Sequence, residues 1–248
     1  MKTRWLILAL ALLGGLVFFR YQRPACAPPL TPRQVAYLRA HYSREALRYF
    51  SQVAFGNDLG TLSPTIRRWN RPRVNVRILS ACDSAERHEV ARILHDLNAI
   101  TRPTHFVVDP HAPPDLKIYL VPRSALSQVF PAADGTANGS FGFQTSSCGE
   151  ILSATVAVAN DLSLPGWKQA VLREELTQSI GLPKDTDRYA KSVFSSNRQI
   201  HIEDPDHSYV QFATEFLPLD KQLIDILYNS GLPLNTSLTD FSAQVLAP

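Results

Sequence analysis

The chain has 248 residues, of which 45% are hydrophobic, so it can bury one good core, and its length favours one or two domains. Its formal net charge is only +3, and basic and acidic residues are scattered along the sequence. A nucleic-acid-binding surface needs clustered Lys and Arg side chains, so we expect no nucleic-acid partner.

The N-terminus predicts an export signal. Lys2 and Arg4 precede an unbroken apolar run at residues 5–19, which fits a signal-peptide core better than a full membrane span. We favour an uncleaved signal anchor at residues 1–22, accommodated by local thinning of the bilayer. Lys2 and Arg4 then stay in the cytoplasm. This predicts a single-pass protein of the bacterial inner membrane with its domain in the periplasm. The alternative is signal-peptide cleavage, which gives a secreted or periplasmic protein.

The cysteine pattern predicts one disulfide bond. Cys26 lies beside the predicted anchor, where it is removed, left free or lipidated, although Arg23 and Pro24 do not fit a lipoprotein signal. Cys82 and Cys148 remain, and in an oxidising compartment two cysteines most simply pair. Such a bond would stabilise the fold by roughly 4 kcal/mol in the chain-entropy model. Two buried free thiols are the alternative.

Three segments are expected after the anchor. Residues 23–32 are proline-rich and predict a stiff spacer. Residues 33–64 form an N-terminal helical segment, in which a single helix starts at Pro32 and continues to residue 55. Residues 65–248 form the main domain.

The main domain alternates short strands with amphipathic helices. The strands are expected at residues 74–79, 105–109, 115–122 and 151–161. The helices are expected at residues 85–101, 167–180 and 219–231, with a Gly- and Ser-rich loop at 132–150 and another loop at 184–216. This order predicts the α+β class with a single mixed sheet.

The helix at residues 167–180 contains the stretch "VLREELTQSIGLP". It has the frame His-Glu-x-x-His-x-x-Gly, but Glu174 and Gln178 stand where the histidines belong. Together with "SVFSS" at residues 192–196 and "LPLDKQLIDILY" at 217–228, it resembles the zincin metalloproteases. It is more similar still to an exported bacterial family known as domain of unknown function 2927, over about residues 65 to 230. The resemblance implies a zincin-like fold, in which one mixed sheet packs with an active-site-like helix and a C-terminal helix. It implies no established activity.

The motif does not favour zinc or any other cofactor. Residues four apart share a helix face, so Glu174 and Gln178 face the same cleft. Zinc prefers nitrogen and sulfur ligands, and an amide carbonyl is a weak one. Lys184 stands where the elongated zinc motif would place its third ligand, and its charge would repel a cation if its side chain pointed inward. Asp185 is adjacent. A hard divalent cation such as Ca²⁺ or Mg²⁺, held by Glu174, Gln178 and Asp185, is the alternative.

Glu175 keeps the position of the general base, which makes it the candidate catalytic residue. A carboxylate can activate water only if another group polarises the substrate, and the nearest candidates in sequence are Arg173 and Lys184. The alternative is a polar helix face with Glu175 hydrogen-bonded inside the fold. Asp220 is expected to cap the last helix rather than to act in catalysis.

Three functions follow from these patterns. The first is a non-catalytic module that binds a peptide or an envelope protein in the cleft through Glu174, Gln178, Lys184 and Asp185. Its partner would pair by β-augmentation with an edge strand, expected at residues 151–161. The second is an atypical metal-dependent peptidase with Glu175 as general base. The third is a structural envelope protein whose cleft has no role.

Overall fold

The computed structural model describes residues 29–56, 64–131, 136–164, 166–195, 200–203 and 208–247. The predicted anchor at residues 1–22 and most of the proline-rich spacer therefore lie outside the described residues. Within these ranges, no helix is both long enough and apolar enough to cross a membrane.

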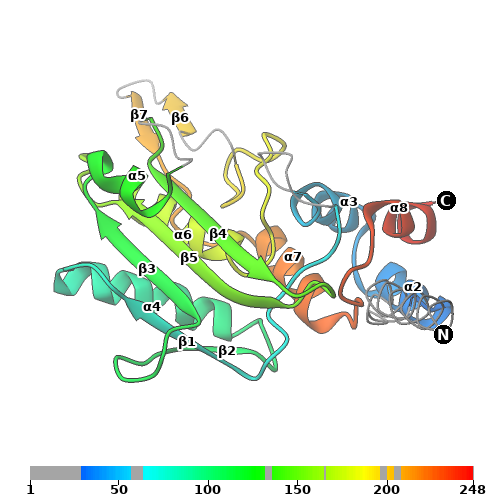
Figure 1. Cartoon of the computed structure of the whole chain (residues 1–248). Helices are drawn as coiled ribbons and strands as arrows, with labels where there is room; N and C mark the ends of the chain where they lie inside the picture. The colour runs from blue at the N-terminus through cyan, green and yellow to red at the C-terminus, as the bar shows by residue number, and fades with distance from the viewer. Residues whose placement is uncertain are drawn as a thin grey trace, which may run out of the picture.

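A five-stranded mixed sheet forms the centre of the protein (Figure 1). Its order is β2-β1-β3-β5-β4, and every neighbouring pair is parallel except β4 and β5. The strands are β1 Arg73–Ile78, β2 His105–Val108, β3 Leu116–Val121, β4 Gly139–Thr145 and β5 Ile151–Ala159. The predicted α+β class with a single large mixed sheet is confirmed. A separate two-stranded sheet pairs β6 Ile200–Glu203 with β7 Ser208–Gln211.

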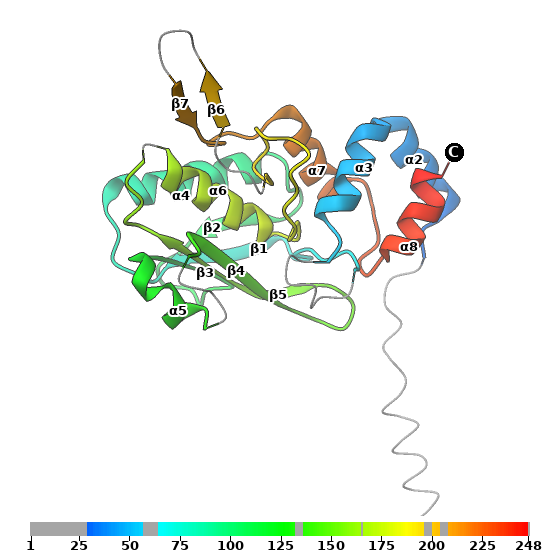
Figure 2. The same cartoon turned by 90° about the horizontal axis from the view of Figure 1, so that it is seen from above.

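Helices cover both faces of the large sheet (Figure 2). Helices α4 (Ser84–Asn98) and α6 (Trp167–Gln178) lie on one face, and the short α5 (Leu126–Val129) lies on the other. Strand β5 contributes side chains to the packing on both faces of the sheet, because successive side chains of a strand point to opposite faces. Val156 and Val158 belong to the main core, whereas Ala157 and Ala159 pack with Leu126 in a smaller cluster.

The N-terminal region contains two helices where one was predicted. Helix α2 (Pro32–His41) ends at Tyr42, whose backbone is extended (φ −121°, ψ 142°). The Ser43 side chain then accepts a hydrogen bond from Ala46 N and caps α3 (Arg44–Val53). Both helices pack near the C-terminal end of the chain, and α3 also contacts α7 (Pro218–Asn229). Two short helical turns, α8 (Leu238–Phe241) and η2 (Ser242–Leu246), complete this part (Figure 1).

The edge of the sheet differs from the prediction. Residues 151–161 were expected to form an edge strand, but β5 lies between β3 and β4. The edge strand next to β5 is β4, within the predicted loop at residues 132–150. Gly139 and Gly142 favoured the prediction of a loop, since glycine is unfavourable inside strands. The predicted loop at residues 184–216 likewise contains β6 and β7.

The predicted Cys82–Cys148 disulfide is wrong, because Cys82 is a free thiol. Cys82 follows the end of β1, whereas Cys148 precedes the start of β5, and the two strands run in the same direction through β3. The two cysteines therefore lie at opposite ends of the sheet. A six-residue strand spans roughly 20 Å, and disulfide-bonded Cα atoms lie within about 7 Å of each other.

Gly181 fixes how helix α6 ends. Its φ is +116°, and a Cβ atom there would lie 2.0 Å from the carbonyl oxygen of Arg67. We expect Gly181→Ala to lower the free energy of unfolding by about 3 kcal/mol or more, because the substitution combines backbone strain with a backbone clash. Urea denaturation measures this loss.

Gly231→Ala is the matched control, since its φ is +73° but its Cβ would approach only Gln34 Nε2, at 4.0 Å. Its expected cost is about 1 kcal/mol, for the left-handed conformation alone. Equal losses in the two variants would contradict the proposed close approach at Gly181.

Candidate functional site

Helix α6 carries polar side chains into the interior of the protein. Every residue from Ala170 to Gln178 is buried. Arg173 is 0% exposed, Glu174 and Gln178 are each 2% exposed, and Glu175 is 3% exposed. Neither glutamate is without an interaction partner. Burial of charged groups costs free energy unless they are paired or hydrogen-bonded, so this helix depends on neighbours that satisfy its polar groups.

Glu175 lies directly against the edge strand. A Cβ atom on Gly139 of β4 would come within 2.6 Å of both Glu175 Oε1 and Val171 Cγ1. Glycine therefore lets the strand approach the helix closely enough for the Glu175 carboxyl group to reach the strand backbone. The candidate catalytic residue is thus placed beside β4, not beside the strand at residues 151–161 that the sequence predicted as the edge.

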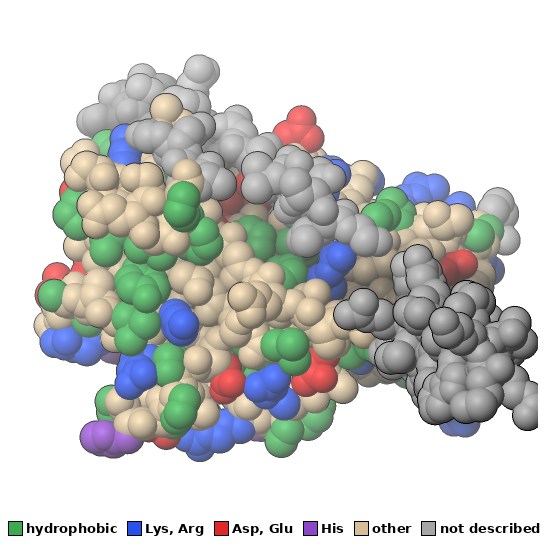
Figure 3. Space-filling model, viewed as in Figure 1, with side chains coloured by type: hydrophobic (Ala, Val, Ile, Leu, Met, Phe, Trp, Pro, Cys, Tyr) green, Lys and Arg blue, Asp and Glu red, His purple; other side chains and the backbone are tan. Residues whose placement is uncertain are grey.

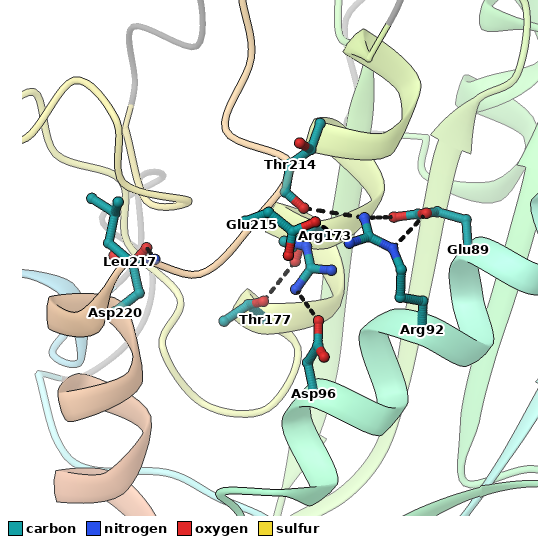
Figure 4. A network of polar contacts seen from close by, with 9 residues as sticks. All are labelled: Glu89, Arg92, Asp96, Arg173, Thr177, Thr214, Glu215, Leu217 and Asp220. Carbon is teal, nitrogen blue, oxygen red and sulfur yellow. Dashed lines mark hydrogen bonds and ion pairs between the residues drawn. The ribbon is translucent and has the colours of Figure 1, made fainter.

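Arg173 is held between α4 and the segment before α7 (Figure 4). Its Nη1 donates to Asp96 Oδ2 on α4 at 2.8 Å, and its guanidinium lies 4.5 Å from the centre of the Phe216 ring. In the described part of the chain, Arg173 Nε and Nη2 have no hydrogen-bond partner. Arg92 of α4 reinforces the arrangement by pairing with both Glu89 and Glu215 (Figure 4). Arg173 therefore holds elements together and has an acidic partner of its own.

Two of the three residues proposed as metal ligands are hydrogen-bonded to each other. The Gln178 side-chain amide donates a hydrogen bond to Asp185 Oδ1. It therefore presents its N–H group, not its carbonyl, to the carboxylate that would share a cation with it. Lys184 is exposed, and its backbone N–H donates to Val53 O at 3.1 Å. Among the described residues, no group of three or more His, Cys, Asp or Glu side chains could hold a metal ion. The donor set does not fit zinc.

The end of α6 is anchored by two aromatic side chains. Trp69 Nε1 donates to Ser179 O at 3.3 Å, and Tyr228 OH donates to Ile180 O at 2.9 Å. The last carbonyl groups of a helix lack partners within it, so both bonds satisfy groups that burial would otherwise leave unpaired. They also tie α6 to the segment before β1 and to α7.

A buried hydrogen-bond chain joins α3, the "SVFSS" segment and α7. Tyr49 OH donates to Ser192 Oγ at 2.7 Å, and Ser192 Oγ donates to Asp220 Oδ1 at 2.6 Å. The backbone N–H groups of Val193 and Leu217 donate to Asp220 Oδ2. Asp220 therefore satisfies the start of α7, as expected, although it is the third helical residue rather than the N-cap. Burial raises the pKa of Tyr49, which keeps its hydroxyl group protonated as a donor.

A family model described as "Protein of unknown function (DUF2927)" matches residues 43–244. The chain belongs to this family. No match is found among curated proteins. Among solved structures, one titled "Structure of myroilysin" aligns with a TM-score of 0.43 and 10% sequence identity, covering 66% of this chain and 98% of that chain. A similarity this low carries no information about chemistry. Family membership confirms the predicted resemblance to this family, and the zinc motif is not shown.

Sequence reasoning found some of these residues and missed others. It placed Gln178 beside Asp185, and the structure shows them hydrogen-bonded. It named Lys184 as a candidate binding residue without a direction, and the structure leaves its side chain exposed. It missed Asp96 and Tyr49 altogether. The sequence did indicate that a partner such as Asp96 must exist, because the cationic Arg173 on a buried helix requires an acidic partner from another element.

Asp220 makes stability depend on pH. Burial raises its pKa to about 6, although hydrogen bonds from Ser192, Leu217 and Val193 lower it in part. Since the folded-state pKa exceeds the unfolded value, the contribution to stability is present below about pH 4 and is lost as the pH rises through 6. The loss amounts to about 3 kcal/mol. We expect Asp220→Asn to remove this part of the pH dependence.

Urea denaturation of both proteins at several pH values between about 4 and 7 checks this expectation. Other titrating groups are common to the two proteins, so the difference between their pH profiles isolates Asp220. Parallel profiles would show that the carboxyl group at position 220 has no shifted pKa.

Proposed function

We propose that this protein is a peptide-binding module of the bacterial cell envelope, built on a protease-like domain, which holds an extended segment of an envelope protein along β4. The supporting observation is that β4 is an edge strand. Within the described residues it pairs only with β5. An unpaired strand edge offers a row of N–H and C=O groups to which another chain can add by β-augmentation.

The hydrogen-bond ladder indicates which residues would bind. Ala159 N donates to Asn138 O at 2.8 Å, which makes these two a hydrogen-bonded pair. Such pairs alternate along an antiparallel ladder. Gly139, Phe141 and Phe143 therefore direct their backbone groups away from β5. Phe141 and Phe143 pack their rings against the main core, on the α6 side. A bound segment would run along these three residues.

The α6 side chains would form the polar side of this site. Glu175 contacts β4 at Gly139, so a segment on β4 would approach its carboxyl group. Glu174, Gln178 and Asp185 follow along the same helix and the loop after it, and the exposed Lys184 lies beside them. We infer that Asp185 and Lys184, which are not buried, select the partner by hydrogen bonds and charge, not by holding a metal, while the buried Glu174 and Gln178 support them from α6.

The cellular location is a separate part of the proposal. The apolar run at residues 5–19 and the basic residues before it favour a single-pass anchor in the inner membrane, with the domain in the periplasm. Cleavage of this segment would leave the same domain free in the periplasm or secreted. In either location the partner would be an envelope protein. The face of the molecule drawn in Figure 3 carries its Lys and Arg side chains dispersed among side chains of other types.

The edge-strand proposal is tested by removing one N–H group. Phe143→Pro removes an outward-facing donor, whereas Phe143→Ala removes the same ring but keeps the donor. For peptides selected from a random library on the natural protein, we expect the Pro variant to bind about fivefold to tenfold more weakly than the Ala variant, the value of one backbone hydrogen bond. Fluorescence anisotropy measures the affinities. Equal affinities would exclude pairing at this residue, and failure to select any peptide would count against the proposal.

The alternative is a peptidase with Glu175 as general base. It is favoured by the contact between Glu175 and the edge strand. Glu175→Gln removes the base but nearly keeps the shape, so an enzyme would lose about two to four orders of magnitude in kcat. A binding module would show no cleavage of the selected peptides in either form and would keep its affinity for them within severalfold. Mass spectrometry of peptides incubated with each protein separates the two functions.

A further inference from the structure

A cavity lies near the edge of the sheet opposite to β4. It has a volume of about 470 Å³ and is lined by the ends of β1 and β2, the connection after β1 and one face of α4. Ligand pockets commonly have volumes of about 300 to 1,000 Å³ and are mostly apolar with a few polar groups. This cavity shares no residue with the site proposed on β4 and α6, so it is a separate candidate.

The lining is apolar apart from a few groups. Hydrophobic surface comes from Ile78, Ala91, Val108 and Pro110, and the buried Val90 lies behind it. Val90 and Ala91 lie on the same face of α4 as Arg87, three and four residues further along. Val108 is 50% exposed, although it is a large hydrophobic residue in a strand. Apolar surface left in water at a cavity indicates that a ligand with an apolar part would gain free energy by covering it.

Two arginines give the cavity its charge. Arg77 and Arg87 both line it, and no carboxylate does. In the described part of the chain, neither forms a salt bridge, and Arg77 Nε is buried without a hydrogen-bond partner. Arg77 Nη1 donates to Pro110 O, and Arg87 Nη1 donates to Cys82 O. Both guanidinium groups retain further N–H donors for an anion.

The nearby carboxylates already have partners. Asp83 accepts a hydrogen bond from Glu86 N at the start of α4, and Glu86 forms a salt bridge with Lys168. Asp109, which follows β2, forms a salt bridge with Arg73. The positive charge of Arg77 and Arg87 is therefore not neutralised by the acidic side chains around them. Guanidinium groups match the planar geometry of a carboxylate.

We propose that this cavity binds a small amphipathic carboxylate, such as a short fatty acid, with its apolar chain on Ala91 and Val108 and its carboxylate paired with Arg77 and Arg87. The apolar lining selects the chain, and the two unpaired cations select the head group. Cys82 supplies a built-in reporter. It is a free thiol that lines the cavity, and its Sγ lies 3.5 Å from Arg87 Nη1.

The experiment measures the rate at which iodoacetamide alkylates Cys82 in the full chain, followed by peptide mass mapping. Octanoate is the probe, and octanol is its uncharged counterpart. At ten times its Kd, octanoate is expected to slow alkylation about tenfold, because the free cavity falls to about a tenth. Octanol is expected to have little effect. The Arg77→Gln/Arg87→Gln double variant should lose the protection, whereas Arg33→Gln, at an exposed position on α2, should keep it.

Three results would overturn the proposal: no protection by octanoate, equal protection by octanol, or protection that survives the double variant. The ratio of rates with and without octanoate is compared within each protein, so a change in the intrinsic reactivity of Cys82 does not affect the outcome. Thermal melting checks that the variants fold. If the double variant does not, Arg87→Gln alone serves, because Arg87 is exposed on α4 and its replacement leaves the core intact.

Discussion

The burial of α6 is the constraint on which the rest of the structure depends. Helix α6 buries the polar side chains of Arg173, Glu174, Glu175 and Gln178. Their transfer from water costs free energy unless they have hydrogen-bond or ionic partners. The surrounding elements supply such partners. Asp96 reaches across from α4, Asp185 returns from the loop after the helix, and Trp69 and Tyr228 take the terminal carbonyl groups through the bonds described above. These elements are thereby fixed relative to one another as well as to the helix.

This constraint also bears on the positions that hold a metal ion in the zinc version of the motif. In the zinc version of this motif, the two imidazole side chains bind the same ion. Here Gln178 and Asp185 are joined directly by a hydrogen bond. A hydrogen-bonded amide and carboxylate can close the same end of the cleft without an ion, and without leaving either group buried and unpaired. The motif is therefore compatible with a stable fold even though it does not supply the ligands that zinc needs.

Sequence patterns predicted the elements whose side chains are regular and missed those that depend on distant contacts. The helix at Ser84–Asn98 and the strand at Leu116–Val121 follow from periodicity alone. Strand β4 does not, because its glycines are explained only by neighbours: a Cβ on Gly139 would meet Glu175, and one on Gly142 would meet Phe130. The break before Ser43 was missed because apolar periodicity continues across it, while the signal was a single capping side chain. The disulfide failed because spacing carries no information about which end of a sheet a cysteine occupies.

Within the candidate site, the sequence supplied the helix frame but not the side chains that support it. Arg173 illustrates the limit, since its partners lie 77 residues earlier at Asp96 and beyond the second sheet at Phe216. No local pattern relates these positions.

The two proposed binding regions lie at opposite edges of one sheet, and α4 connects them. Its N-terminal half contributes Arg87, Val90 and Ala91 to the cavity, whereas its C-terminal half contributes Asp96 to Arg173 on α6. A regular helix transmits a displacement along its length because its backbone hydrogen bonds resist local deformation. A ligand that shifted the start of α4 would therefore strain the Asp96–Arg173 pair, and that pair is buried at Arg173, where a lost partner is costly. The pair thus disfavours any movement of α4 when a ligand binds. Because α4 then stays in place, we expect the two regions to bind their ligands independently.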